Sequence, residues 1–215
     1  MTTESFAVVG ALAAVVALGA SQRLTTLVAR DIGVAHPRFP WWSYVVAAAV
    51  GAVVGAVSLA RNENETASST ALIAIVTALM LVQAPLDLAT RRLYRSVTLV
   101  ASAATVLVVV AAANDDDDVS SAFAAFGAAV AVTAVYALLH RWSPSSLGWG
   151  DVLLVAPLAL AVGHVALDRV AAWQLVASAT GALHALVARR VRGTSSIPFG
   201  PHLLMAAWVV LLASV

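Results

Sequence analysis

Long apolar runs recur along the whole chain and set what it can fold into. The hydrocarbon core of a bilayer takes roughly 20 consecutive apolar residues to cross as a helix. Eight runs approach that length, at about residues 5–22, 41–60, 70–86, 97–113, 119–139, 151–167, 170–188 and 198–215. The pattern predicts an all-α, polytopic membrane helix bundle of about eight transmembrane helices, forming one domain over residues 1–215.

Composition excludes several other classes of protein. The chain is 61% hydrophobic and 11% charged, whereas soluble domains carry about 25% charged residues. It has no cysteine, which rules out disulfides, cysteine nucleophiles and cysteine-ligated zinc. Its five histidines are scattered without HExxH spacing, so neither a metal nor a cofactor is predicted. The net charge of +1 gives no indication of a nucleic-acid partner. The predicted surroundings are the lipid bilayer, and nothing in the sequence indicates an oligomeric state.

The first apolar run has two interpretations. Gly19 and Ala20 suit the small-residue cleavage site of a secretory signal peptide. However, the segment before the run contains Glu4 and no Lys or Arg, whereas signal peptides begin with a positively charged region. We therefore expect a retained helix.

Arginine placement predicts the orientation. All twelve basic residues are arginine, and cytoplasmic loops of membrane proteins are enriched in them. With the N-terminus and the C-terminus outside, the cytoplasmic loops are residues 23–40, 88–96, 140–150 and 189–197. These loops contain ten arginines, namely Arg23, Arg30, Arg38, Arg91, Arg92, Arg95, Arg141, Arg189, Arg190 and Arg192. The other side has Arg61, Arg169 and the acidic run Asp115–Asp118.

Two carboxylates stand at ends of apolar runs that this orientation places on the cytoplasmic side. Asp87 follows the third run and Asp151 precedes the sixth. Acids within membrane segments are costly and are usually functional. Two neighbouring carboxylates can share one proton, so that one activates a water and the other donates to a carbonyl oxygen. Gly148 and Gly150 lack side chains, which would let a substrate backbone approach Asp151.

Structural interpretations of the same residues stay open. Asp151 suits the N-cap of the sixth helix, and Asp87 suits a helix-surface pair with Arg91. His184 lies within a span, where a polar contact between helices is favoured over a ligand role. A different function is also compatible with the paired acids, a proton- or cation-coupled transporter that uses them as a relay.

Three motifs resemble those of the type IV prepilin peptidases, a family of GxGD membrane aspartic proteases. Leu147-Gly148-Trp149-Gly150-Asp151-Val152 is similar to the family's second-aspartate segment, and residues 87–93 are similar to its first. Ile197-Pro198-Phe199-Gly200-Pro201 resembles a motif before the family's last helix. The resemblance is strongest over residues 70–215. The chain departs from the family at Leu153, where a lysine is usual, and at Tyr94-Arg95, where Pro-Asn is frequent. These departures leave open a catalytically silent pilus-assembly membrane protein as an alternative.

The resemblance implies a function and a set of site residues. It implies cleavage of leader peptides from prepilin-like substrates at the cytoplasmic face of the plasma membrane. It implies that Asp87 and Asp151 are catalytic, with Gly148, Gly150, Pro198 and Gly200 binding substrate or supporting the site. Because the chain lacks cysteine and its first loop is short, it resembles the short, peptidase-only form, and methyltransferase activity is not predicted.

Overall fold

The computed structural model describes residues 19, 22, 23, 26, 67–115, 119–144, 147–193 and 197–214. The helices expected over residues 5–22 and 41–60 lie outside this part, apart from a few isolated positions, and so do Asp116–Asp118. Whether the first run is retained as a helix, and whether eight spans exist, therefore stay predictions.

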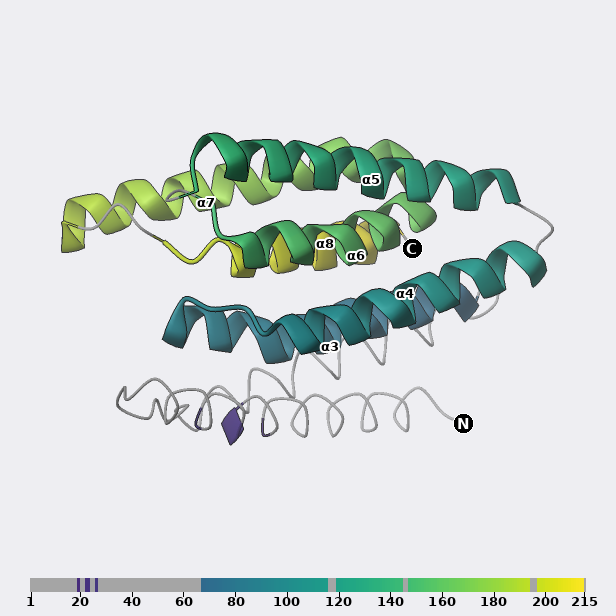
Figure 1. Cartoon of the computed structure of the whole chain (residues 1–215), viewed down its shortest axis with the longest axis horizontal. Coiled ribbons are helices and arrows are strands. Elements are labelled where there is room, and N and C mark those ends of the chain that lie inside the picture. The colour runs from purple at the N-terminus through teal and green to yellow at the C-terminus, as the bar shows by residue number, and fades with distance from the viewer. Residues whose placement is uncertain are drawn as a thin grey trace.

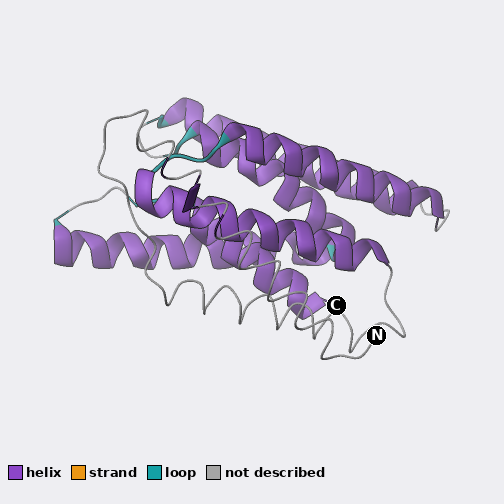
Figure 2. Cartoon of the chain, turned by 90° about the horizontal axis from the view of Figure 1, so that it is seen from below, coloured by secondary structure: helices purple, strands orange, loops and turns teal. Residues whose placement is uncertain are grey.

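The other six apolar runs are all helical. The helices are α3 (Ala67–Thr90), α4 (Arg95–Asp115), α5 (Val119–Trp142), α6 (Trp149–Val165), α7 (Val170–Arg192) and α8 (Gly200–Ser214), with a short 3-10 helix, η1 (Leu167–Arg169), between α6 and α7. The described residues contain no strand (Figure 2). The prediction of an all-α fold is confirmed for this part of the chain.

Several helix boundaries differ from the predicted ones, and two of the differences matter for the acids. Helix α3 continues past Asp87 to Thr90, and α6 begins at Trp149, before Asp151. The predictions followed the apolar run, but a helix continues for as long as its backbone hydrogen bonds do. Asp87 therefore lies within the last turn of α3, and Asp151 lies within the first turn of α6.

Four of the described helical segments are long and apolar enough to cross a membrane. They span Ser68–Thr90, Arg95–Asn114, Val119–Trp142 and Leu167–Val191. Helices α6 and α8 are apolar but shorter. A chain with several such helices is a multi-pass membrane protein.

The described helices form a bundle in which the shorter helices are inside. In Figure 1, α6 and α8 lie between the pair α5 and α7 and the pair α3 and α4. Helix α6 contacts each of the other described helices and is buried along most of its length, as expected for a helix that is apolar on all sides. The outer helices instead expose large apolar side chains, such as Val100, Phe123 and Leu175. Such a surface suits lipid tails rather than water.

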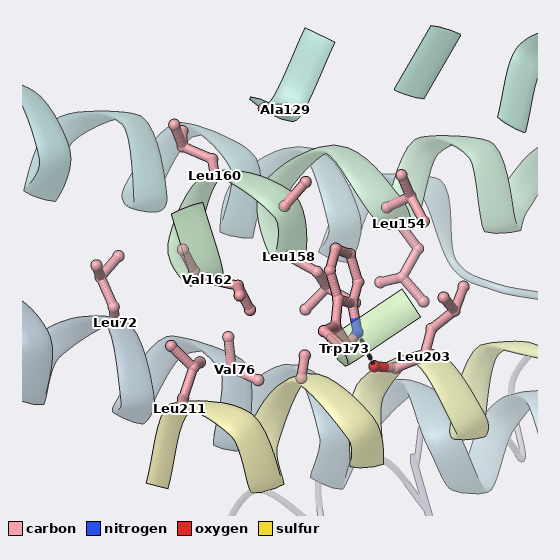
Figure 3. Packing of buried hydrophobic residues seen from close by; sticks show 14 of the residues in the cluster. Leu72, Val76, Ala129, Leu154, Leu158, Leu160, Val162, Trp173, Leu203 and Leu211 are labelled. Carbon is pink, nitrogen blue, oxygen red and sulfur yellow. Dashed lines mark hydrogen bonds between the residues drawn. The ribbon is translucent and has the colours of Figure 1, made fainter. Parts of the chain in front are cut away.

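Two tryptophans fix α8 against its neighbours. Trp173 of α7 is fully buried, and its indole N–H donates to the backbone oxygen of Leu203, at 3.0 Å (Figure 3). Trp208 of α8 donates to the hydroxyl oxygen of Thr77 in α3, also at 3.0 Å. Buried tryptophan needs such a partner for its N–H. These bonds hold α8 between α7 and α3, and its first residue, Gly200, lies beside the end of α3.

Candidate active site

Asp87 and Asp151 come together at one end of the bundle. The end of α3 and the starts of α6 and α8 all lie at the left in Figure 1. The side chain of Asp87 is 5% exposed and that of Asp151 is 9% exposed. The two carboxyl groups are close enough to interact electrostatically. Both predicted acids are therefore buried in one site, although they come from helices that are far apart in sequence.

Asp151 is not the N-cap of α6, which corrects one of the structural interpretations. The N-cap is Gly148, because Trp149 and Gly150 are already helical. The Asp151 carboxylate reaches back to accept the backbone N–H of Gly148 at 3.2 Å. A carboxylate in the first turn satisfies a free helix N–H and is stabilised by the helix dipole. This contact also fixes the direction of the Asp151 side chain.

Asp87 is held differently. Its Oδ2 atom is buried and has no hydrogen-bond partner among the described residues. The backbone N–H of Gly200 donates a hydrogen bond to the carboxyl group, and the guanidinium of Arg91 attracts the group electrostatically. A buried carboxyl oxygen without a donor is unfavourable unless it carries a proton or a ligand donates to it. This atom is therefore suited to a partner that the folded chain does not itself supply.

Leu93 contacts the glycines beside both acids. A Cβ on Gly150 would lie 3.0 Å from the Leu93 Cβ, and one on Gly200 would lie 3.1 Å from the Leu93 Cδ2. The Gly200 Cβ would also lie 2.8 Å from Oδ2 of Asp87. Close packing therefore requires glycine at both positions. The expected open approach along Gly150 is taken by Leu93. A Cβ on Gly148 would lie 3.2 Å from Oδ2 of Asp151, so the space beside Gly148 is taken by that carboxylate.

Aromatic side chains that the sequence analysis did not single out complete the site. The Phe199 ring stacks with that of Tyr136 at a centroid distance of 6.4 Å, and Tyr136 is near enough to Asp151 to interact electrostatically. The Tyr136 hydroxyl donates to Oε1 of Gln174 at 2.7 Å. The signal in the sequence was weak, a single tyrosine in the apolar run of α5.

The C-terminal motif forms the short segment before α8. Pro198 is half-buried there. Phe199 packs so closely on α7 that a Cβ on Gly181 would lie 2.7 Å from its ring. His184 Nδ1 lies 2.9 Å from His202 Nε2, which confirms the expected polar contact between helices. Among the described residues, no group of three or more His, Cys, Asp or Glu side chains is placed to hold a metal ion.

The fold and the site together define a class, that of helical multi-pass membrane proteins with a pair of buried carboxyl groups at one end of the bundle. Residues 74–187, slightly more than half of the chain, match the model of the type IV leader peptidase family. The chain belongs to that family. Asp87 and Asp151 both lie within the matched residues, whereas Pro198 and Gly200 lie beyond them.

One curated relative is a type 4 prepilin-like proteins leader peptide-processing enzyme from Escherichia coli O78:H11 (strain H10407 / ETEC). It is 41% identical over 83 residues, which are 36% of this chain and 28% of the relative. The alignment thus covers less than a third of that enzyme. No solved structure matches the chain.

Proposed function

We propose that the protein is an aspartic endopeptidase that removes leader peptides from type IV prepilin-like proteins. The observation that carries the proposal is the pairing of two buried acids, Asp87 and Asp151, within the residues matched to the leader peptidase family. Membership of the family supports the substrate class, and the acid pair supports the reaction type.

The chemistry follows from one shared proton. The ionised acid of the pair takes a proton from a water, whose oxygen attacks the carbonyl carbon of the scissile peptide. The protonated acid donates to the carbonyl oxygen. As the tetrahedral intermediate collapses, the C–N bond breaks and the leaving amine takes a proton from the pair. Burial strengthens these interactions because little water competes with them.

We also propose that the site faces the cytoplasm across the plasma membrane, in an eight-span chain with both termini outside. Arginines gather at the end of the bundle that carries the acids, at Arg91, Arg92, Arg95, Arg141, Arg189, Arg190 and Arg192. Arg169 is the described arginine at the opposite end. This asymmetry is typical of cytoplasmic loops. We propose no methyltransferase activity.

The decisive test is leader cleavage in cells that co-express the protein with a prepilin encoded beside it. We expect a shortened pilin on a gel with the unsubstituted protein, and none with Asp87→Asn or Asp151→Asn, since asparagine keeps the shape but cannot accept the proton. Each single change should reduce the rate about as much as the double change, because the acids act as one unit. Asp168→Asn, an exposed acid at the opposite end, is the matched control and should leave cleavage unchanged.

Either single asparagine variant that still cleaves would contradict the two-acid mechanism. Absence of cleavage by the unsubstituted protein, tried with several prepilins, would favour the catalytically silent assembly protein instead. Ion or substrate flux into vesicles that depends on the two acids would favour the transporter.

The pH dependence of the rate is a second test of the same pair. One acid must be ionised and the other protonated, so the rate should fall at low pH, where both are protonated, and at high pH, where both are ionised. The two apparent pKa values of this bell-shaped profile belong to the pair rather than to either residue. A rate that does not change across the acidic range would contradict the mechanism.

A further inference from the structure

Gln83 is a polar side chain that the chemistry of the two acids leaves unused. It lies one helical turn before Asp87 in α3 and is fully buried. Its Nε2 donates to the backbone oxygen of Tyr94 at 2.8 Å and to the hydroxyl oxygen of Thr98 at 3.0 Å. Its Oε1 accepts the backbone N–H of Tyr94 at 2.9 Å. Both N–H groups and the oxygen of this buried amide are hydrogen-bonded, so the contact is specific to glutamine at this position.

The contact holds the turn that connects α3 to α4. This turn comprises residues 91–94, and Arg91 adopts a φ of 54° there. A left-handed conformation is unfavourable for a residue other than glycine, so the surrounding contacts must hold it in place. Gln83 binds the backbone of Tyr94 through both its N–H and its C=O, and thereby fixes the end of the turn.

The same turn places Leu93 beside the two glycines that lie next to the acids. Leu93 is the residue before Tyr94, and its side chain contacts Gly150, which precedes Asp151, and Gly200, which lies beside Asp87. A shift of the turn would move Leu93 against either glycine. A Cβ at Gly150 or Gly200 would already lie only 3.0 or 3.1 Å from Leu93, so the space beside Leu93 fits glycine and little more. The position of Leu93 therefore sets how closely the starts of α6 and α8 approach the end of α3.

We propose that Gln83 is a positioning residue for the acid pair, acting through the Tyr94 backbone and Leu93; this inference rests on the proposed function. The role requires an N–H at position 94. Proline at this position would have no N–H to donate, and Oε1 of Gln83 would then be buried without its donor. Gln83 and the non-proline residue at position 94 thus form a matched pair.

The first measurement is the kinetics of prepilin cleavage by the purified full chain. Gln83→Met removes the amide but keeps the length of the side chain, and Tyr94→Pro removes the N–H. Each should lower kcat by about 10- to 100-fold with KM nearly unchanged, as expected when reacting groups are misplaced by about 1 Å. The double variant should be no worse than the single ones, because both remove the same contact. Tyr94→Ala keeps the N–H and should retain kcat.

A variant that only weakens the bundle provides the structural control. Thr77→Val removes a partly buried hydrogen bond between α3 and α8, the one that Trp208 donates, at a distance from the turn. It should lower the unfolding temperature without changing kcat at temperatures where the protein is folded. Equal loss of kcat in Thr77→Val and Gln83→Met would mean that Gln83 acts through general stability, and would overturn the positioning role.

The second measurement reports the turn without relying on activity. The native chain has no cysteine, so Leu93→Cys with Gly150→Cys creates one pair of thiols. Their Cβ atoms would start 3.0 Å apart, so the turn must give by a few tenths of an ångström to reach the spacing of a disulfide, and the pair reports the position of the turn rather than activity. We expect a mild oxidant to cross-link the pair, measured as loss of thiols that react with a maleimide. The cross-link should form more slowly when Gln83→Met or Tyr94→Pro is added, and at the same rate with Thr77→Val.

The two measurements separate the possible failures. Absence of cleavage by the unsubstituted protein would overturn the proposed function, and with it any catalytic positioning, whatever the cross-link shows. Normal kcat in Gln83→Met, or an unchanged cross-linking rate in both Gln83→Met and Tyr94→Pro, would overturn the positioning role alone.

Discussion

At the scale of single residues, the site depends on two glycines as well as on the two acids. Gly150 and Gly200 leave room for Leu93, and Gly200 also leaves room for the Asp87 carboxyl group. Contacts this close can be relieved only by moving the neighbouring group. At Gly200 that neighbour is one of the two acids, so a small steric change acts directly on the proposed chemistry.

Gly200→Ala tests this directly. Its Cβ would lie 2.8 Å from Oδ2 of Asp87, so the carboxyl group must turn away, and we expect cleavage to fall by about 100-fold. Gly127→Ala in α5 is the matched control, since its Cβ meets nothing within 4 Å. It should leave cleavage unchanged and raise helix stability by about 0.5–1 kcal/mol. Equal activity of the two variants would show that Gly200 does not limit the position of Asp87.

At the scale of helices, α6 is the element on which the others pack. It is one of the shortest helices, yet it contacts each of the other described helices and begins with Asp151 in its first turn. Near its far end, Gly163 lets α5 approach closely: a Cβ there would lie 3.3 Å from the Ala125 Cα and 3.4 Å from the Ala128 Cβ. Small residues at such an interface allow two helix backbones to pack.

Gly163→Val should therefore destabilise the bundle while leaving the chemistry intact. Overpacking of this kind typically costs about 1–3 kcal/mol, measurable as a lower unfolding temperature in detergent. Because the position is at the opposite end of α6 from Asp151, kcat of the folded protein should be retained. Gly127→Val, at an exposed position with open space, separates the packing effect from the intrinsic effect of valine in a helix. Equal unfolding temperatures for the two valine variants would contradict close packing of α5 on α6.

At the scale of the whole molecule, the two ends of the bundle differ in charge. The end that carries the acids also carries the turn at residues 91–94 and the arginine-rich end of α7, whereas the other end carries η1 and the start of α5. Such an asymmetry sets the orientation of a membrane protein during insertion, because loops rich in arginine stay on the cytoplasmic side. The orientation of the site thus depends on loops rather than on the buried residues.

Single cysteines introduced into the cysteine-free chain test this orientation. In intact cells, an impermeant thiol reagent should label Asp168→Cys, which is exposed in η1. It should not label Ser145→Cys, whose position falls between α5 and α6 in the sequence. Permeabilised cells should show labelling at both positions, which establishes that each thiol can react. Labelling of Ser145→Cys from outside would overturn the proposed topology.

Some features of the protein followed from the sequence because their physical causes are local. Apolar runs of membrane-crossing length predicted helices, and the six runs that the structure describes are helical. The acids at Asp87 and Asp151 were predicted from their places at the ends of such runs, together with the motifs around them. Their meeting in one site, which the sequence analysis expected, is a feature of the described structure.

Other features were decided by tertiary structure, because they depend on contacts between residues far apart in the chain. No local pattern indicates that Gln83 binds the Tyr94 backbone, that Leu93 contacts both Gly150 and Gly200, or that Gly150 is filled rather than open. The N-cap of α6 also shifted to Gly148, since a helix start depends on backbone bonds as well as on the apolar pattern. Hydrophobicity along a chain determines which segments become helices, whereas the side-chain contacts between those helices determine the geometry of the site.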